Sequence, residues 1–148
     1  MAARPADVRR ELDDGIELDD DASRVDLDAV HDYLANESYW AEGRPREVVE
    51  RLVREAQRVV GIYDGQRQVG FARAFTDGVS LVYLADVYVL PGYRGRGLGV
   101  ELVREIVENG PYADLRWVLH TRDARTLYEK FRFGAPSGRL MERMRPEP

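Results

Sequence analysis

The sequence predicts an α/β fold with a mixed, mostly antiparallel sheet, one parallel β-α-β crossover and helices on both faces. Three observations lead to this class. Two amphipathic helical segments precede a group of β-type segments, Asp-Gly turn signals join three of those segments into a meander, and a later helical segment lies between two strands. The connection through that later helix requires its two flanking strands to be parallel.

The order of elements follows from local signals along the chain. In chain order we expect a strand at 15–18, helices at 26–37 and 45–57, strands at 59–63, 69–75 and 80–89, a helix at 97–109, a strand at 115–120, a short helix from 123, and a weakly alternating closing strand at 139–144. Asp26 can cap the first helix, and Pro45 suits the first position of the second because its φ is already helical. The apolar residues of both segments recur at spacings of three and four, so each helix has one face to bury.

The strands are bounded by turn residues. Asp-Gly pairs at 64–65 and 77–78 each separate two runs rich in Val, Ile, Phe and Tyr, and they predict tight reversals. Pro91 ends the third strand of this meander, and Asp123 is expected to cap the last short helix.

Length, charge and cysteine content exclude several classes of protein. The 148 residues include 22 basic and 27 acidic side chains, which give a net charge of −5, and there is no cysteine. This charge gives no reason to expect nucleic acid or an anionic membrane as a partner, and a chain without cysteine has no disulfide or thiolate metal site. No secretory signal or apolar run of membrane-spanning length is found, so a cytoplasmic location is expected. We interpret residues 1–12 as a mobile arm and 13–148 as a single domain.

The most informative segment is the loop between the third meander strand and the next helix. Residues 94–99 read Arg-Gly-Arg-Gly-Leu-Gly. Glycine permits positive φ and close approach of a ligand, and the free N–H groups at the start of a helix favour an anion such as phosphate. The arginines add donors for phosphate oxygens. The spacing matches neither the dinucleotide fingerprint nor the P-loop, and a purely structural glycine turn is the alternative.

Two segments of the chain resemble the GNAT superfamily of N-acetyltransferases. Residues 87–99, Val-Tyr-Val-Leu-Pro-Gly-Tyr-Arg-Gly-Arg-Gly-Leu-Gly, are similar to its acyl-CoA-binding motif. Residues 123–133 are similar to its second block, Asn-x-x-Ala-x-x-Leu-Tyr-x-Lys-x-Gly-Phe. Arg132 stands where the family usually has glycine, and Asp123 does not cleanly match the asparagine. The resemblance covers roughly residues 15–145 and implies acetyl-CoA as acyl donor, with no metal.

The resemblance also implies a division of roles. Backbone groups of Val87 and Val89 would pair with the pantetheine arm, with the Val89 N–H on the thioester carbonyl, and the glycine loop would hold the pyrophosphate. The cofactor-binding residues are therefore Val87, Val89, Arg94, Gly95, Arg96, Gly97, Leu98 and Gly99. Tyr128 matches the family tyrosine that protonates the departing CoA thiolate, and simple packing beside Leu127 is the alternative.

Two residues can serve as the proton acceptor. Asp86 lies within an apolar strand, where burial would raise its pKa, although a carboxylate hydrogen-bonded at a sheet bulge is an equal alternative. His120, at the end of the parallel strand, has a suitable intrinsic pKa.

The family's acceptor pocket is built partly by the first two helices and their connection. Tyr39 and Trp40 fall there and could form a cation–π wall for an amine, or belong to the core. The acidic first helix would favour a cationic acceptor, unless its carboxylates are merely solvated.

The sequence therefore predicts an N-acetyltransferase that moves an acetyl group from acetyl-CoA to a primary amine by direct attack in a ternary complex. No cysteine and no Gly-x-Ser-x-Gly elbow is present for an acyl-enzyme. The acceptor, a small molecule or a protein amine, is left open, as is the length of the acyl chain. Homodimers are common in the family. The alternatives are a non-catalytic acyl-CoA sensor or interaction module on the same fold, and an arginine-loop module for nucleic-acid phosphate, which the net charge opposes.

Overall fold

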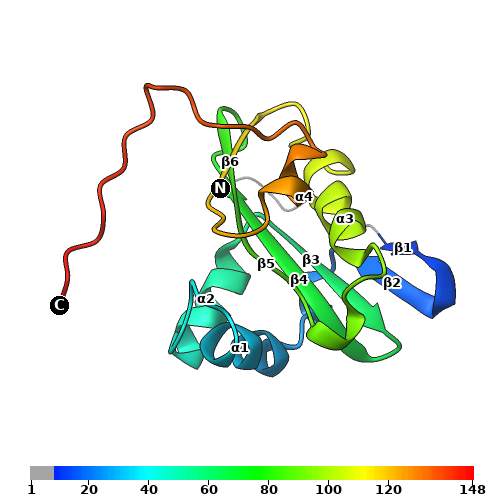
Figure 1. The fold of residues 1–148 in the computed structure, drawn as a ribbon. Coiled ribbons are helices and arrows are strands. Elements are labelled where there is room, and N and C mark those ends of the chain that lie inside the picture. The colour runs from blue at the N-terminus through cyan, green and yellow to red at the C-terminus, as the bar shows by residue number, and fades with distance from the viewer. Residues whose placement is uncertain (1–8) are drawn as a thin grey trace.

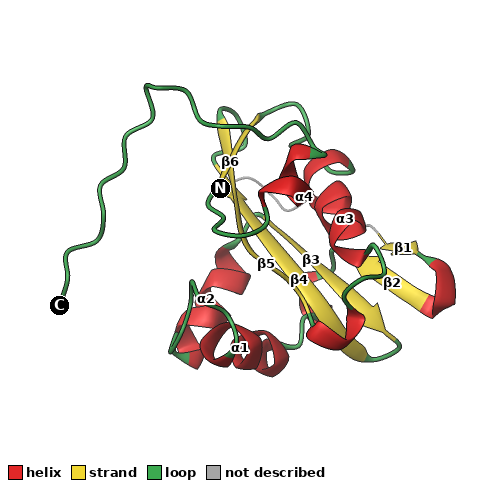
Figure 2. Cartoon of the chain, in the orientation of Figure 1, coloured by secondary structure: helices red, strands yellow, loops and turns green. Residues whose placement is uncertain are grey.

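The computed structural model describes residues 9–148 and shows one six-stranded sheet with helices on both faces (Figure 1; Figure 2). In chain order the elements are β1 (Arg9–Glu11), β2 (Ile16–Asp19), α1 (Leu27–Asn36), α2 (Arg46–Glu55), β3 (Arg58–Asp64), β4 (Arg67–Thr76), β5 (Leu81–Val89), α3 (Leu98–Val103), β6 (Arg116–Leu119) and α4 (Arg125–Glu129). The strands lie side by side in sequence order. All neighbours are antiparallel except β5 and β6, so the predicted class and its parallel crossover are confirmed.

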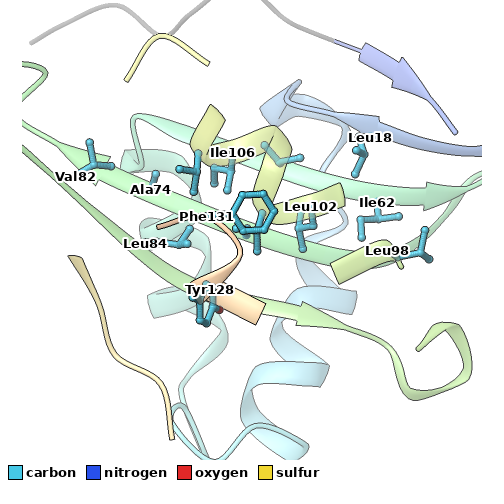
Figure 3. Packing of buried hydrophobic residues seen from close by; sticks show 14 of the residues in the cluster. Leu18, Ile62, Ala74, Val82, Leu84, Leu98, Leu102, Ile106, Tyr128 and Phe131 are labelled. Atoms are coloured by element: carbon cyan, nitrogen blue, oxygen red, sulfur yellow. The ribbon is translucent and has the colours of Figure 1, made fainter. Parts of the chain in front are cut away.

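Two apolar cores lie on opposite faces of the sheet. Val59 and Phe71 pack with α1 and α2, whereas the next residues along the strands, Val60 and Ala72, pack with α3. This alternation is what a pleated strand requires when both of its faces are covered. Figure 3 shows the core beneath α3 and α4, with Phe131 of the α4 region packed among residues of α3 and the strands.

The helix ends follow the predicted caps in part. The Asp26 carboxylate accepts a hydrogen bond from the Ala29 N–H at 3.0 Å and caps α1 as expected. Pro45 is the N-cap of α2 rather than its first helical residue. α4 is capped by Ala124, whose N–H donates to the Thr121 hydroxyl at 3.0 Å, so the expected cap at Asp123 is wrong.

The expected helix over 97–109 is regular only in its first part. α3 is followed by a π-helical turn at Arg104–Glu108. The buried Arg58 guanidinium donates to the carbonyls of Glu105 and Ile106 at 2.7 and 3.1 Å. Backbone carbonyls in this turn that lack an α-helical hydrogen bond thus accept hydrogen bonds from a side chain of β3. A Cβ at Gly110 would overlap this guanidinium, which accounts for glycine at that position.

The two ends of the chain differ from prediction. Of the expected arm at 1–12, residues 1–8 lie outside the described residues, and Arg9–Glu11 form β1. Arg10 of β1 pairs with Glu101 of α3 at 2.9 Å and with Glu105 of the π-helical turn at 2.7 Å. The expected strand at 139–144 is wrong, because no strand follows β6 within the described chain.

The sequence of this tail explains why it forms no strand. Leu140 and Met141 are adjacent and would point to opposite faces, so a strand there has no single apolar side to bury. The last residues extend away from the body (Figure 1). Over the part of the chain that the structure describes, no helix is both long and apolar enough to cross a membrane.

Candidate functional site

The sheet opens at its only parallel strand pair among the described residues. The ladder between β5 and β6 ends where Leu84 pairs with Leu119, and β5 continues for five residues without β6. The Leu90 N–H donates to a carbonyl of β4 at 2.9 Å. Since backbone groups alternate sides along a strand, those of Val89 and Val87 face away from β4, toward the opening. An extended ligand can add to this edge as a further strand.

The glycine loop at 95–99 presents free backbone donors. The N–H groups from Gly95 to Val100 donate no hydrogen bond to any described residue. Gly97 is the N-cap of α3 with φ of 76°, a conformation that strains other residue types. A Cβ on Gly95 or Gly97 would meet nothing within 4 Å, so the space beside the loop is open. These groups fit an anion such as a pyrophosphate.

Arg94, which precedes the glycine loop, and Arg96, which lies within it, have different surroundings. The Arg94 side chain turns back, its Nε donating to the Val89 carbonyl at 2.9 Å and its Nη2 to the Tyr33 hydroxyl at 3.0 Å. It therefore fastens the loop to β5 and α1. The Arg96 guanidinium lies 5.3 Å from the Tyr93 ring centre and has no carboxylate partner in the described chain. Of the two, Arg96 is the one free to meet a phosphate.

Asp86 lies at a bulge in β5 with φ of 55°, and its side chain is 3% exposed. Its carboxylate accepts hydrogen bonds from Arg73 Nε at 2.6 Å, Trp40 Nε1 at 2.7 Å and Arg44 Nη1 at 3.0 Å. Burial acts to raise the pKa of Asp86, but the charges of Arg73 and Arg44 and these hydrogen bonds outweigh it, and the pKa is lowered. The expected rise is therefore wrong, and the alternative, a hydrogen-bonded carboxylate at a bulge, is found.

A cleft of about 510 Å³ lies beside the opening of the sheet. Its lining brings together six of the residues expected at the site, namely Tyr39, Trp40, Asp86, Val87, His120 and Tyr128. A second cavity, of about 570 Å³, lies between β6, α4 and the tail. Tyr128 and His120 line both cavities. We place the chemistry in the first, because it also contains the open edge of β5.

Tyr128 is a buried phenol at the border of the core and the cleft. Figure 3 shows it at the margin of the apolar cluster, and its ring meets that of Phe133 edge-on at 5.9 Å. Burial raises the pKa of Tyr128 to about 12, so the group stays protonated at neutral pH. Its hydroxyl has no hydrogen-bond partner among residues 9–148, which leaves a donor available to a ligand.

His120 is oriented from two sides. Its Nε2 lies 2.8 Å from a Glu142 carboxylate oxygen, and its Nδ1 is hydrogen-bonded to the Tyr83 hydroxyl. A carboxylate on Nε2 favours the tautomer with its proton there, which leaves Nδ1 to accept from Tyr83. Neither partner was anticipated, because Glu142 belongs to the tail and Tyr83 precedes the motif on β5.

Tyr39 and Trp40 line the cleft as expected. The cation that contacts the Tyr39 ring, however, is an arginine side chain of the same protein. The Arg122 guanidinium lies 3.8 Å from the centre of the Tyr39 ring, and the Arg122 backbone N–H donates to the Tyr39 hydroxyl at 2.8 Å. Sequence reasoning missed Arg122, Arg44 and Arg73. A signal existed only for Arg73, a charge within an otherwise apolar strand.

A mixed sheet that opens between two parallel strands, next to a glycine loop with free N–H groups, defines the class of GNAT-fold acetyltransferases. The chain belongs to the acetyltransferase (GNAT) family, whose sequence profile matches residues 21–133. The family uses acyl-CoA donors. Among the residues that the structure describes, no three His, Asp or Glu side chains are grouped so as to hold a metal ion.

Several known proteins are similar to this chain. A Xanthomonas campestris protein of the GNAT family is 31% identical, with a TM-score of 0.81 over 97% of this chain and 96% of its own. A GNAT family acetyltransferase of Streptococcus pneumoniae is 24% identical, with a TM-score of 0.65 and 97% of both chains covered. AAC(6')-Iy, in complex with the bisubstrate analogue CoA-S-monomethyl-acetylneamine, shares the fold at 15% identity and a TM-score of 0.60. The comparison covers 96% of this chain and 100% of that one.

A Gibberella zeae protein named as an acetyltransferase is similar over a shorter segment. It is 39% identical over 66 residues, which are 43% of this chain. The match spans 37% of the length of that relative.

Proposed function

We propose that this chain is an N-acetyltransferase that transfers an acetyl group from acetyl-CoA to a primary amine by direct attack within a ternary complex. The proposal rests on one observation above all. The open edge of β5 adjoins the glycine loop at one end and borders the cleft that contains the Tyr128 hydroxyl. A ligand with a phosphate end and a reactive end fits this order of groups, and the bisubstrate analogue bound to AAC(6')-Iy supports it.

The residues divide the binding of acetyl-CoA between backbone and side chains. When bound, acetyl-CoA supplies a thioester acetyl group and a thiol leaving group. The N–H groups at 95–99 hold the pyrophosphate, with Arg96 as an added donor. Backbone groups of Val87 and Val89 pair with the pantetheine arm. The Val89 N–H donates to the thioester oxygen, where negative charge develops during attack.

Three side chains handle protons in the transfer. The amine attacks as a neutral group, a C–N bond forms, and the C–S bond breaks. Tyr128 donates its hydroxyl proton toward the departing sulfur. Its raised pKa keeps the phenol protonated at neutral pH but also makes it a weaker acid than a thiol, so the transfer depends on the position of the hydroxyl beside the sulfur. The proton lost by nitrogen passes to His120, through Tyr83, whose hydroxyl bonds to Nδ1. Asp86 does not take this proton, because its lowered pKa makes it a weak base.

The test is calorimetric titration of the protein with acetyl-CoA, with desulfo-CoA and ATP as controls, followed by a thiol-release assay with a panel of amines. Micromolar binding of acetyl-CoA, weak binding of ATP and turnover of some amine are the expected results. Absence of acetyl-CoA binding would overturn the proposal. Binding with no turnover on any amine, unchanged by Tyr128→Phe, would instead establish the non-catalytic acyl-CoA sensor.

A further inference from the structure

The acceptor cleft has more cationic than anionic side chains. Three guanidinium groups line it, those of Arg44, Arg73 and Arg122, against the carboxylates of Asp86 and Asp123. Arg73 and Arg44 both bond to one oxygen of Asp86, Oδ2, at 2.6 and 3.0 Å. One carboxylate therefore neutralises two guanidiniums only in part, and positive charge remains in a cleft that is partly shielded from water.

Arg122 adds a cation whose position is fixed without a carboxylate. Its guanidinium carbon lies over the Tyr39 ring, 3.8 Å from the ring centre, and its backbone N–H donates to the Tyr39 hydroxyl at 2.8 Å. Within residues 9–148 its side chain has no salt bridge. A stacked guanidinium keeps its outer N–H groups available, and such a fork matches a carboxylate or phosphate geometrically.

The acidic residues of α1 do not balance this charge. Asp26 caps its own helix, Asp32 accepts from Asn36 at 2.9 Å, and Asp28 pairs with Arg46 at 3.1 Å. These carboxylates are engaged locally, and they are absent from the cleft lining. The sequence-based expectation of a cationic acceptor thus finds no support at the site itself.

We infer that the acceptor is a small amine that also carries an anionic group, a carboxylate or a phosphate, which Arg122 and Arg44 bind. The inference rests on the proposed acetyl transfer and narrows its substrate class. The same cationic surroundings disfavour an ammonium ion, and so favour the neutral amine that attack requires. The positive charge of the cleft therefore binds the anionic group of the acceptor and also favours the neutral form of its amine.

The experiment compares amines that carry an anionic group with counterparts that lack it. Each rate is referred to the concentration of neutral amine, because loss of the carboxylate also lowers the pKa of the ammonium group. α-Amino acids are tested against their amides, and phosphoethanolamine against ethanolamine, with kcat/KM measured for each at saturating acetyl-CoA. Binding of each compound to the free protein is also measured by calorimetry, which is independent of turnover. We expect the anionic member of a pair to be preferred by roughly tenfold or more, as for a charge-assisted hydrogen bond. Which pair responds shows whether the anion is a carboxylate or a phosphate.

Two variants localise the effect. Arg122→Gln is expected to reduce the preference for the anionic member by roughly tenfold. Arg51→Gln, a matched change on the exposed face of α2, is expected to leave it unaltered. If acetyl-CoA binds and amines turn over, but neither pair shows a preference for the anion or the amide is preferred, the inference is overturned while the acetyltransferase proposal stands. Failure to bind acetyl-CoA overturns the proposed function itself.

Discussion

Replacing Asp86 by asparagine tests the charge balance at the bulge of β5. The substitution keeps the shape of the side chain and an oxygen for the Trp40 indole N–H. Asparagine is also one of the few residues that tolerate the positive φ of 55° found there. The change therefore removes little except the negative charge that Arg73 and Arg44 share.

The size of the effect follows from burial. Breaking a buried ion pair by removing one partner costs about 3–5 kcal/mol, because the remaining charge is left uncompensated. The side chains of Arg73 and Arg44 are 10% and 20% exposed, so each regains some hydration. We expect Asp86→Asn to lower the free energy of unfolding by about 2–3 kcal/mol near neutral pH.

The pH dependence has a definite sign. The pKa of Asp86 is lowered in the folded state, so its stabilising contribution is complete above the unfolded-state pKa of about 3.9 and is lost as the pH falls through the folded-state value. The difference in the free energy of unfolding between wild type and variant is thus largest at neutral pH and shrinks below about pH 4.

Urea unfolding of both proteins, in steps from about pH 7 to about pH 3, measures this difference. Asp28→Asn, at an exposed carboxylate paired with Arg46, is the matched control and is expected to change the free energy of unfolding by less than about 1 kcal/mol. Equal stabilities of wild type and Asp86→Asn at neutral pH, or a gap that stays constant on acidification, would refute the reasoning.

Three further predictions concern the proposed activity. Gly99→Glu should weaken acetyl-CoA binding by roughly tenfold or more without changing the circular dichroism spectrum, because it adds bulk and negative charge beside the loop. Gly138→Glu, in the tail, is the matched control. Equal affinities of the two variants for acetyl-CoA would show that the loop is not the phosphate site. Tyr128→Phe should lower kcat on any accepted amine by roughly tenfold or more with little change in the Kd for acetyl-CoA, and a wild-type rate would remove its role as an acid. His120→Gln should lower kcat on any accepted amine by roughly tenfold or more, and Glu142→Gln, which removes the carboxylate bonded to the imidazole Nε2, should lower kcat by less; wild-type rates in both would exclude the relay.

Most of the fold could be predicted because its signals are local. The N-cap at Asp26 and the Asp-Gly turns act through neighbouring backbone groups, and the parallel pairing of β5 with β6 follows from the single helix between them. The exceptions arise where distant groups intervene. The π-helical turn after α3 depends on donors from Arg58 in β3, and β1 is joined by ion pairs from Arg10 to Glu101 and Glu105.

The candidate site was only partly predictable, for the same reason. Gly97 and Tyr128 belong to contiguous motifs, and the structure has them at the helix start and beside the cleft, respectively. The partners of His120, by contrast, come from β5 and from the tail, 37 and 22 positions away along the chain. No spacing rule connects residues so far apart.

By itself, the sequence determined the order of elements from β2 to α4, the glycine loop at the start of α3, and membership of a family through motifs of adjacent residues. Only the tertiary structure decided the electrostatics of the cleft. Asp86 was expected to have a raised pKa because its strand is apolar, yet Arg73 across the ladder and Arg44 from the α1–α2 connection lower that pKa. Charge interactions act through space over a few ångströms, and which side chains come that close is set by the packing of strands and loops from separate parts of the chain.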